Sequence, residues 1–188
     1  MKLNYKKSLK IVTLLLTSLL IATASATVYN YLYITSTIGV EGDPIKFTTG
    51  VDYTSAKGSA EGISSDNQTV TFNGMKGING TLRTYSDPLR IKNTHATDDY
   101  TVQVRVDGTW TPNSNIKYIN ITIIKYSDDT TLGCISLAPG GGNTTAFTGS
   151  GITMAHGAVW RVQWDIFWLS SATSSDTTTV KLRVDASK

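Results

Sequence analysis

The residue types on which most enzymatic chemistry depends are scarce in this chain and far apart. Its 188 residues include two histidines, His95 and His156, and one cysteine, Cys134. A zinc site needs roughly three or four His, Cys or acidic ligands at suitable spacing, and a Ser-His-Asp triad needs a histidine held beside its nucleophile. Both histidines instead occur in polar stretches typical of turns. We therefore expect no catalytic residues, no metal ligands and no cofactor, and interpret the protein as not an enzyme.

Two acidic pairs and one glycine run are the remaining candidates for binding small ligands. Asp98-Asp99 and Asp128-Asp129 each supply far fewer oxygens than the roughly six to eight that a calcium ion takes. Gly140-Gly141-Gly142 is not followed by Lys and Ser or Thr, as a phosphate-binding loop would be, and a hairpin tip explains it. Cys134 cannot form an intrachain disulfide, and the alternation around it predicts a small buried side chain. An intermolecular bridge through Cys134 is the alternative.

The first 26 residues predict a cleaved signal peptide. Four lysines and no acidic residue lie in the first ten positions, and an apolar run of about eleven residues follows them. Ala24-Ser25-Ala26 then supplies the small residues that a signal peptidase accepts, which places cleavage between Ala26 and Thr27. The apolar run is shorter than the roughly 20 residues of a membrane-spanning helix, although a signal anchor is an alternative.

Cleavage changes the charge of the chain and the partners that it suggests. The formal charge of +3 becomes −1, because the leader removes four lysines. Clustered Lys and Arg, the mark of nucleic-acid binding, are missing from the remaining sequence. We expect a secreted protein, extracellular or on the cell surface, with no nucleic-acid partner and no membrane association after cleavage.

Alternation of apolar and polar residues with a period of two dominates the rest of the chain and predicts half-buried strands. In the segment 158–168 it places Trp160, Trp164 and Trp168 on one face, which we interpret as a core stripe and not as a platform for sugars. Polar turns at intervals of roughly ten residues separate the strands, and the segment 54–66 is expected to be an exposed loop. This pattern predicts an all-β fold, an antiparallel two-sheet sandwich that is jelly-roll-like and spans residues 39–188. Strands are expected at 28–38, 45–53, 68–72, 89–93, 100–106, 118–126, 132–137, 144–147, 158–168 and 180–184.

Residues 27–38, directly after the cleavage site, carry no charge and are expected to form an extended N-terminal strand. A long, uncharged strand edge promotes aggregation, so this strand pairs either inside its own sheet or with another chain. The second option is donor-strand complementation, which generates an open filament when repeated head to tail. Periodicity alone does not separate the two options. The residues expected at such an interface are Val28, Tyr29, Tyr31, Leu32, Tyr33, Ile34 and Ile38.

Three classes of function remain in view. The first is a homopolymeric extracellular filament whose only partner is the chain itself, with lateral bundling of filaments. The second is a monomeric secreted binding module, either carbohydrate-binding or associated with a surface layer. The third, a secreted hydrolase, fits the scarcity of catalytic residue types least well.

A leader ending in Ala24-Ser25-Ala26, followed by the segment 28–34, resembles the subunits of archaeal bundling pili, which are related to the biofilm-fibre protein TasA and to camelysin. The segments 45–50 and 89–94, the latter leading into 100–106, resemble the strand, turn, strand arrangement of that jelly-roll family. The resemblance implies a polymer linked by donor strands that bundles and scaffolds a biofilm. Some camelysin-like relatives are labelled metallopeptidases, and the missing metal ligands argue against that activity here.

Four Asn-x-Ser/Thr sequons could accept N-linked glycans if the protein is exported in a host that glycosylates. Asn79 and Asn143, on expected turns, are the stronger candidates. Asn67 is a further candidate, and Asn120, inside an expected strand, is acceptable only if it faces solvent.

Overall fold

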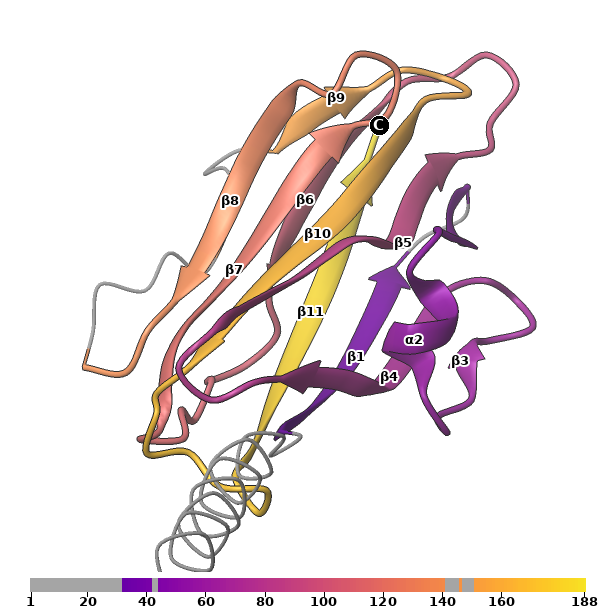
Figure 1. The fold of residues 1–188 in the computed structure, drawn as a ribbon. Coiled ribbons are helices and arrows are strands. Elements are labelled where there is room, and N and C mark those ends of the chain that lie inside the picture. Colours follow the sequence, from indigo (N-terminus) through magenta and orange to yellow (C-terminus); the bar gives the residue numbers. More distant parts are fainter. Residues whose placement is uncertain (1–31, 42–43, 141–145, 147–150) are drawn as a thin grey trace, which may run out of the picture.

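Two β-sheets packed face to face form the described part of the chain (Figure 1). The computed structural model of the protein describes residues 32–41, 44–140, 146 and 151–188. The six-stranded sheet has the order β3 (Gly62–Ile63), β4 (Thr69–Gly77), β1 (Leu32–Glu41), β11 (Thr177–Ser187), β6 (Tyr100–Val106) and β9 (Ile152–Met154). The five-stranded sheet has the order β2 (Ile45–Thr49), β5 (Leu82–Asn93), β10 (Val159–Trp168), β7 (Ile116–Lys125) and β8 (Thr131–Leu137). The predicted all-β, two-sheet sandwich is confirmed.

The core lies between the sheets and consists of the inward faces of alternating strands. β10 shows this most clearly, because Trp160, Trp164 and Trp168 are at most 2% exposed, as are Val162 and Ile166 between them. Full burial of such side chains contributes roughly 1.5–3 kcal/mol each. The expected core stripe is therefore confirmed, and these three tryptophans cannot form a sugar platform.

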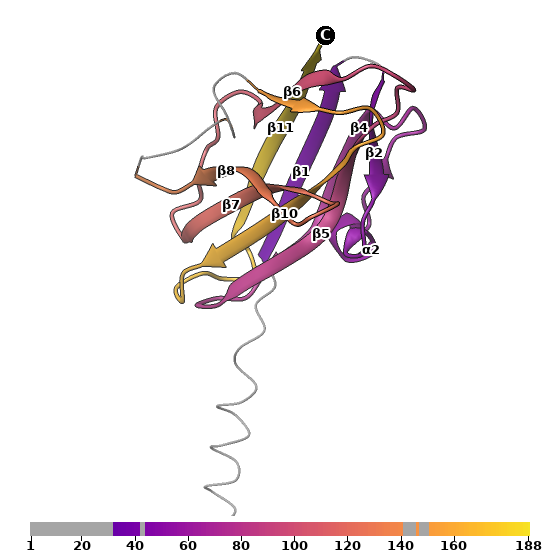
Figure 2. The same ribbon diagram turned by 90° about the horizontal axis from the view of Figure 1, so that it is seen from above.

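Strand β1 occupies the middle of its sheet, between β4 and β11 (Figure 2). It pairs antiparallel with β4 and parallel with β11, so the sandwich is not antiparallel throughout. The expected boundary between residues 38 and 39 falls inside this strand, and in the single chain residues 32–38 belong to the sandwich. Ala26, Thr27, Val28, Tyr29 and Tyr31 lie outside the described residues.

The Asn73-Gly74 pair has the composition of a turn, but it lies inside β4 as a bulge. The register with β1 shifts there, between the pairs Ile34↔Met75 and Ser36↔Phe72. Gly74 is required because a Cβ atom at this position would lie 2.5 Å from the nitrogen of Gly58. The extra residue lets β4 bend around the helix that packs beside it.

The segment 54–66, expected to be an exposed loop, contains two elements instead. The short helix α2 (Tyr53–Lys57) buries Ala56, and β3 pairs with β4. The Asn73 side chain fixes the chain after the helix, because its Oδ1 accepts the N–H groups of Ser59 and Ala60, both at 2.9 Å.

Cys134 is exposed, so the prediction that it is buried is wrong. β8 takes its phase from β7: Ile135 pairs with Ile121 and Leu137 with Ile119, and all four are buried. This register turns Cys134 to the outer face, opposite Thr122. Of the expected strand 144–147 only Ala146 is described, as an isolated bridge to Arg105.

Candidate functional site

The first candidate site is the position that β1 occupies in its sheet. We call it the slot, and it is bounded by β4 on one side and β11 on the other. Ile38 lies opposite Val70 and Leu182, and all three side chains are buried. Ile34, which is also buried, has Met75 as its partner on β4. The slot therefore has apolar walls on both sides, and the described side chains of β1 fill it in the protein's own chain.

Ser36 fits this slot imperfectly. It pairs with Phe72 on β4 and with Val180 on β11, and its residue is fully buried. Its Oγ has no hydrogen-bond partner among the described residues. A buried hydroxyl without a partner costs about 1–3 kcal/mol, so the centre of β1 is held less firmly than an apolar strand would be.

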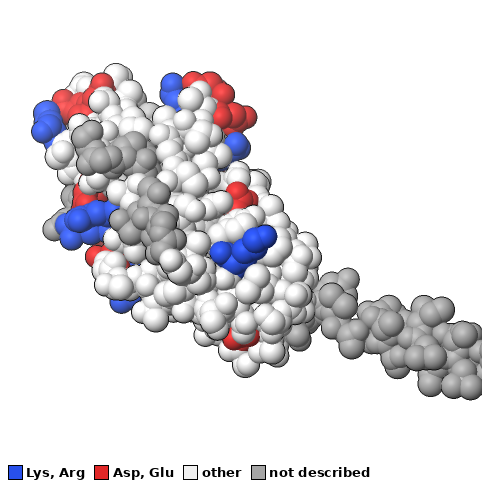
Figure 3. Space-filling view, turned by 90° about the vertical axis from the view of Figure 1, so that its left-hand side faces the viewer, with Lys and Arg blue, Asp and Glu red and all other residues white. Residues whose placement is uncertain are grey.

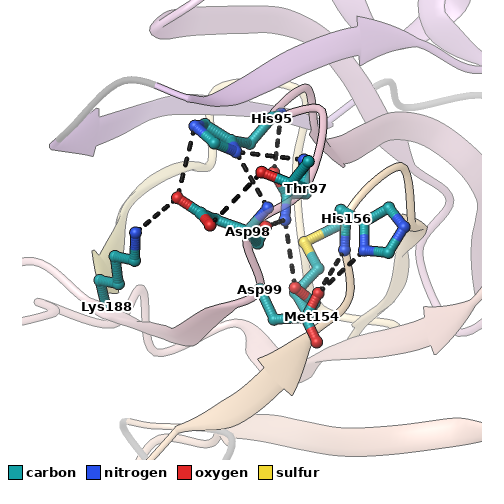
Figure 4. A network of polar contacts seen from close by, with 8 residues as sticks. His95, Thr97, Asp98, Asp99, Met154, His156 and Lys188 are labelled. Atoms are coloured by element: carbon teal, nitrogen blue, oxygen red, sulfur yellow. Dashed lines mark hydrogen bonds and ion pairs between the residues drawn. The ribbon is translucent and has the colours of Figure 1, made fainter.

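A network of His, Asp and Lys side chains is the second candidate site and joins three segments at one end of the sandwich (Figure 4). The Nδ1 atom of His95 accepts the N–H of Asp98 at 2.9 Å, and its Nε2 lies 3.5 Å from an Asp98 carboxylate oxygen. Lys188, at the end of the sequence shown, donates to the same carboxylate at 2.5 Å. This hydrogen bond lowers the pKa of Asp98 below its ordinary value.

The second half of the network connects the turn after β9 to the start of β6. The backbone N–H of His156 donates to Asp99 Oδ1 at 2.8 Å, and the ring Nδ1 lies 3.2 Å from the same oxygen. The backbone hydrogen bond is the main cause of the lowered pKa of Asp99. Both histidines lie in loops, as expected, but each is paired with an aspartate.

The chemistry open to this network is limited. Within the described part of the chain, no group of three His, Cys, Asp or Glu side chains is arranged to hold a metal ion. Asp98 and Asp99 bind loop backbone and Lys188, and they do not converge on a common point as cation ligands would (Figure 4). The geometry is that of a structural network that connects two loops to the end of β11.

The four sequons differ in their surroundings. Asn67 is exposed, with a positive φ of 59°, in the turn before β4. Asn79 has its Oδ1 buried, whereas Asn120 lies on the outer face of its sheet and accepts a hydrogen bond from Ser136 Oγ at 2.8 Å. Asn143 lies outside the described residues.

Charged side chains on the face shown in Figure 3 stand in small groups of both signs, with wide uncharged areas between them. Such a surface offers no extended basic patch on that face for a polyanion. None of the helices that the structure describes is long and apolar enough to cross a membrane. No protein-family model matches the chain, and no curated protein is significantly similar to it.

The sequence interpretation missed one residue with a candidate role, Trp110. It lies in the connection between β6 and β7, outside every alternating segment, and lines a hollow beside β11. Its isolation from the core stripe is the sequence signal that could have identified it.

Proposed function

We propose that the protein is a non-catalytic structural subunit of an extracellular filament, in which each copy donates strand β1 to the sheet of the next copy (donor-strand complementation). The observation that carries this proposal is the position of β1: it is the first described strand, yet it lies in the middle of a sheet and pairs on both sides.

The slot that β1 leaves is complementary to β1 of a second copy. Withdrawal uncovers the edges of β4 and β11 and the apolar side chains of Val70, Phe72 and Leu182. An incoming β1 restores the same backbone pairs and buries Ile34 and Ile38 again. Exchange therefore conserves the contacts, and head-to-tail repetition generates an open filament.

Two features of β1 favour its release. Its ladder with β11 is parallel, which is slightly less stable per residue than an antiparallel ladder. Ser36 adds, at the centre of the strand, a buried hydroxyl that has no partner in the described part of the chain. In an isolated chain the slot has only its own β1 to hold, so occupation in cis is the state expected before assembly.

The resemblance to pilus subunits of the TasA and camelysin group supports the same proposal, as does the leader sequence, which predicts export. Lateral bundling of the filaments, a biofilm role and N-linked glycans belong to the proposal on the same basis.

A disulfide lock on β1 tests the proposal. Thr37 and Thr71 are cross-strand partners on the outer face, so cysteines at both positions, with Cys134→Ser, close β1 into its own sheet on oxidation. We expect the oxidised monomer to form no filaments by electron microscopy and the reduced protein to form them. The matched control is Thr122→Cys with native Cys134, a pair outside β1. Filaments that form equally well with the lock closed reject exchange.

A monomeric secreted binding module is the second candidate. The observation in its favour is that β1 already completes its own sheet, so the chain needs no partner to close its core. This alternative predicts a monomer by light scattering at every concentration and no filaments.

A further inference from the structure

A hollow of about 470 Å³ opens where β6 ends and leaves β11. The ladder between the strands closes with the N–H of Asp107, which donates to the C=O of Lys181 at 2.8 Å. Gly108, with a φ of 78°, then turns the chain away. The edge of β11 from Thr177 to Val180 is left without a β6 neighbour. One wall of the hollow consists of Thr177, Thr178, Thr179 and Lys181, and residues 109–111 form the other.

Trp110 is held in a fixed position at this hollow. Its Nε1 donates to Thr178 Oγ1 at 3.2 Å, and Thr178 is only 6% exposed. The loop is anchored a second time by Asn113, whose Nδ2 donates to Asp176 Oδ1 at 3.1 Å and to the C=O of Thr177 at 3.3 Å. The indole is partly exposed, and it also packs against the hydrophobic core. Its orientation is already set by these contacts and hydrogen bonds, which lowers the entropic cost of binding.

The lining of the hollow selects among classes of ligand. One carboxylate, Asp107, is too few for a divalent cation, which takes several oxygen ligands. A phosphate would meet one ammonium group, on Lys181, and that carboxylate. An apolar ligand would remove water from the threonine hydroxyls without replacing their hydrogen bonds. A neutral ligand rich in hydroxyl groups satisfies the lining.

A peptide that adds a strand to the open edge of β11 fits less well. Strand addition depends on a row of free main-chain groups. Here the C=O of Thr177 already accepts Asn113, and the ladder to β6 resumes at Lys181. This edge therefore offers too few free main-chain groups for strand addition.

We propose that this hollow binds a neutral saccharide. The sugar packs the apolar C–H face of one ring on Trp110, and its hydroxyls exchange hydrogen bonds with Asp107 and with the threonines of both walls. This site lies on the side of β11 opposite to β1, so it serves a filament subunit and a monomer equally.

Tryptophan fluorescence gives a direct test with the full chain. Trp160, Trp164 and Trp168 are buried, so quenching by acrylamide reports on Trp110. We expect saturable protection from quenching by at least one of the trisaccharides of glucose, mannose, galactose or N-acetylglucosamine at millimolar concentration. Trp110→Ala should weaken binding at least about tenfold in calorimetry, because it removes the stacking surface.

A gentler substitution separates binding from folding. Thr179→Val keeps the shape of an exposed residue on the wall and removes one hydroxyl, which should weaken saccharide binding about three- to tenfold. Thr122→Val, on the outer face of the other sheet, should leave binding unchanged. The proposal is overturned if none of the four trisaccharides protects Trp110, if Thr179→Val binds as tightly as the wild type, or if only inorganic phosphate, calcium or a peptide protects it.

Discussion

Ser36 and Val180 are neighbours across the parallel pair of β1 and β11, at the centre of the six-stranded sheet. Val180 is buried as part of the core, whereas Ser36 brings a hydroxyl that finds no partner among the described residues. The strand that would have to move for a filament to grow thus carries an unfavourable contact in its slot.

Replacing Ser36 by Ala should stabilise the monomer by about 1 kcal/mol, because the unpaired buried hydroxyl is removed. Urea unfolding of the monomer measures this change. The same variant should assemble more slowly, since β1 is held more firmly. Ser136→Ala is the control, because Ser136 donates to Asn120 on the outer face and its loss should slightly destabilise the protein. A Ser36→Ala protein that is less stable than the wild type contradicts this prediction.

Gly74→Ala should destabilise the protein by about 2 kcal/mol, because the new Cβ would meet backbone atoms of Gly58 and Ser55 at 2.5 Å. The helix α2 would have to move away from the bulge in β4. Gly157→Ala is the comparison. Apart from its chain neighbours, no heavy atom of the described residues lies within 4 Å of its added Cβ, so only its positive φ opposes the change, at about 1 kcal/mol. Equal losses for the two variants would refute the close packing of α2 on the bulge.

Acid should destabilise the folded protein by protonating Asp98, which accepts a hydrogen bond from Lys188 after the last strand. The pKa of Asp98 is lower in the folded protein than the ordinary 3.8, chiefly because Lys188 donates to it. The unfolded chain therefore takes up the proton first as pH falls. The stabilising effect of the carboxylate is fully present above about pH 5 and is lost as pH falls through the folded pKa.

The melting temperature of wild type and Asp98→Asn, measured from pH 7 to pH 2, tests this effect. The Asp98→Asn variant should show a smaller fall in melting temperature at acid pH, because its amide does not titrate. Glu61→Gln, at an exposed carboxylate on another loop, is the control. Identical pH profiles for wild type and Asp98→Asn would remove Asp98 from the acid response.

Among the described sequons, Asn67 should be modified most completely in a host that attaches N-linked glycans. It is exposed in a turn, whereas the Oδ1 of Asn79 is buried. Peptide mass spectrometry measures the occupancy of each position. Higher occupancy at Asn79 than at Asn67 would mean that the turn at 78–81 opens before the glycan is attached.

The sequence was sufficient for the features that depend on local period. The stripe of Trp160, Trp164 and Trp168 follows from alternation alone, because a strand places every second side chain on one face. Alternation alone did not show which face of the sheet Cys134 lies on. Cys134 faces outward because β8 takes its register from β7, and register depends on pairing between strands. The bulge at Asn73-Gly74 has the composition of a turn and differs from one only because α2 packs against it.

The candidate sites depend on contacts between distant segments, which explains why the sequence showed only part of them. The extended N-terminal strand was visible as a pattern, but its parallel partner β11 lies near the other end of the chain. The hollow beside Trp110 is lined by Asp107 and Thr179, which are far apart in the sequence. It exists only because the chain turns away from β11 at the end of β6, and this turn was not visible in the sequence pattern.

Mixing two single-cysteine proteins tests strand exchange most directly. One chain carries Thr37→Cys and the other Thr71→Cys, both with Cys134→Ser, so the disulfide between these cross-strand partners can form only between chains. The exchange account predicts that filaments grown from the mixture and then oxidised yield covalent dimers containing one chain of each kind. Filaments that yield no such mixed dimer would show that each β1 stays in its own sheet, which contradicts the account.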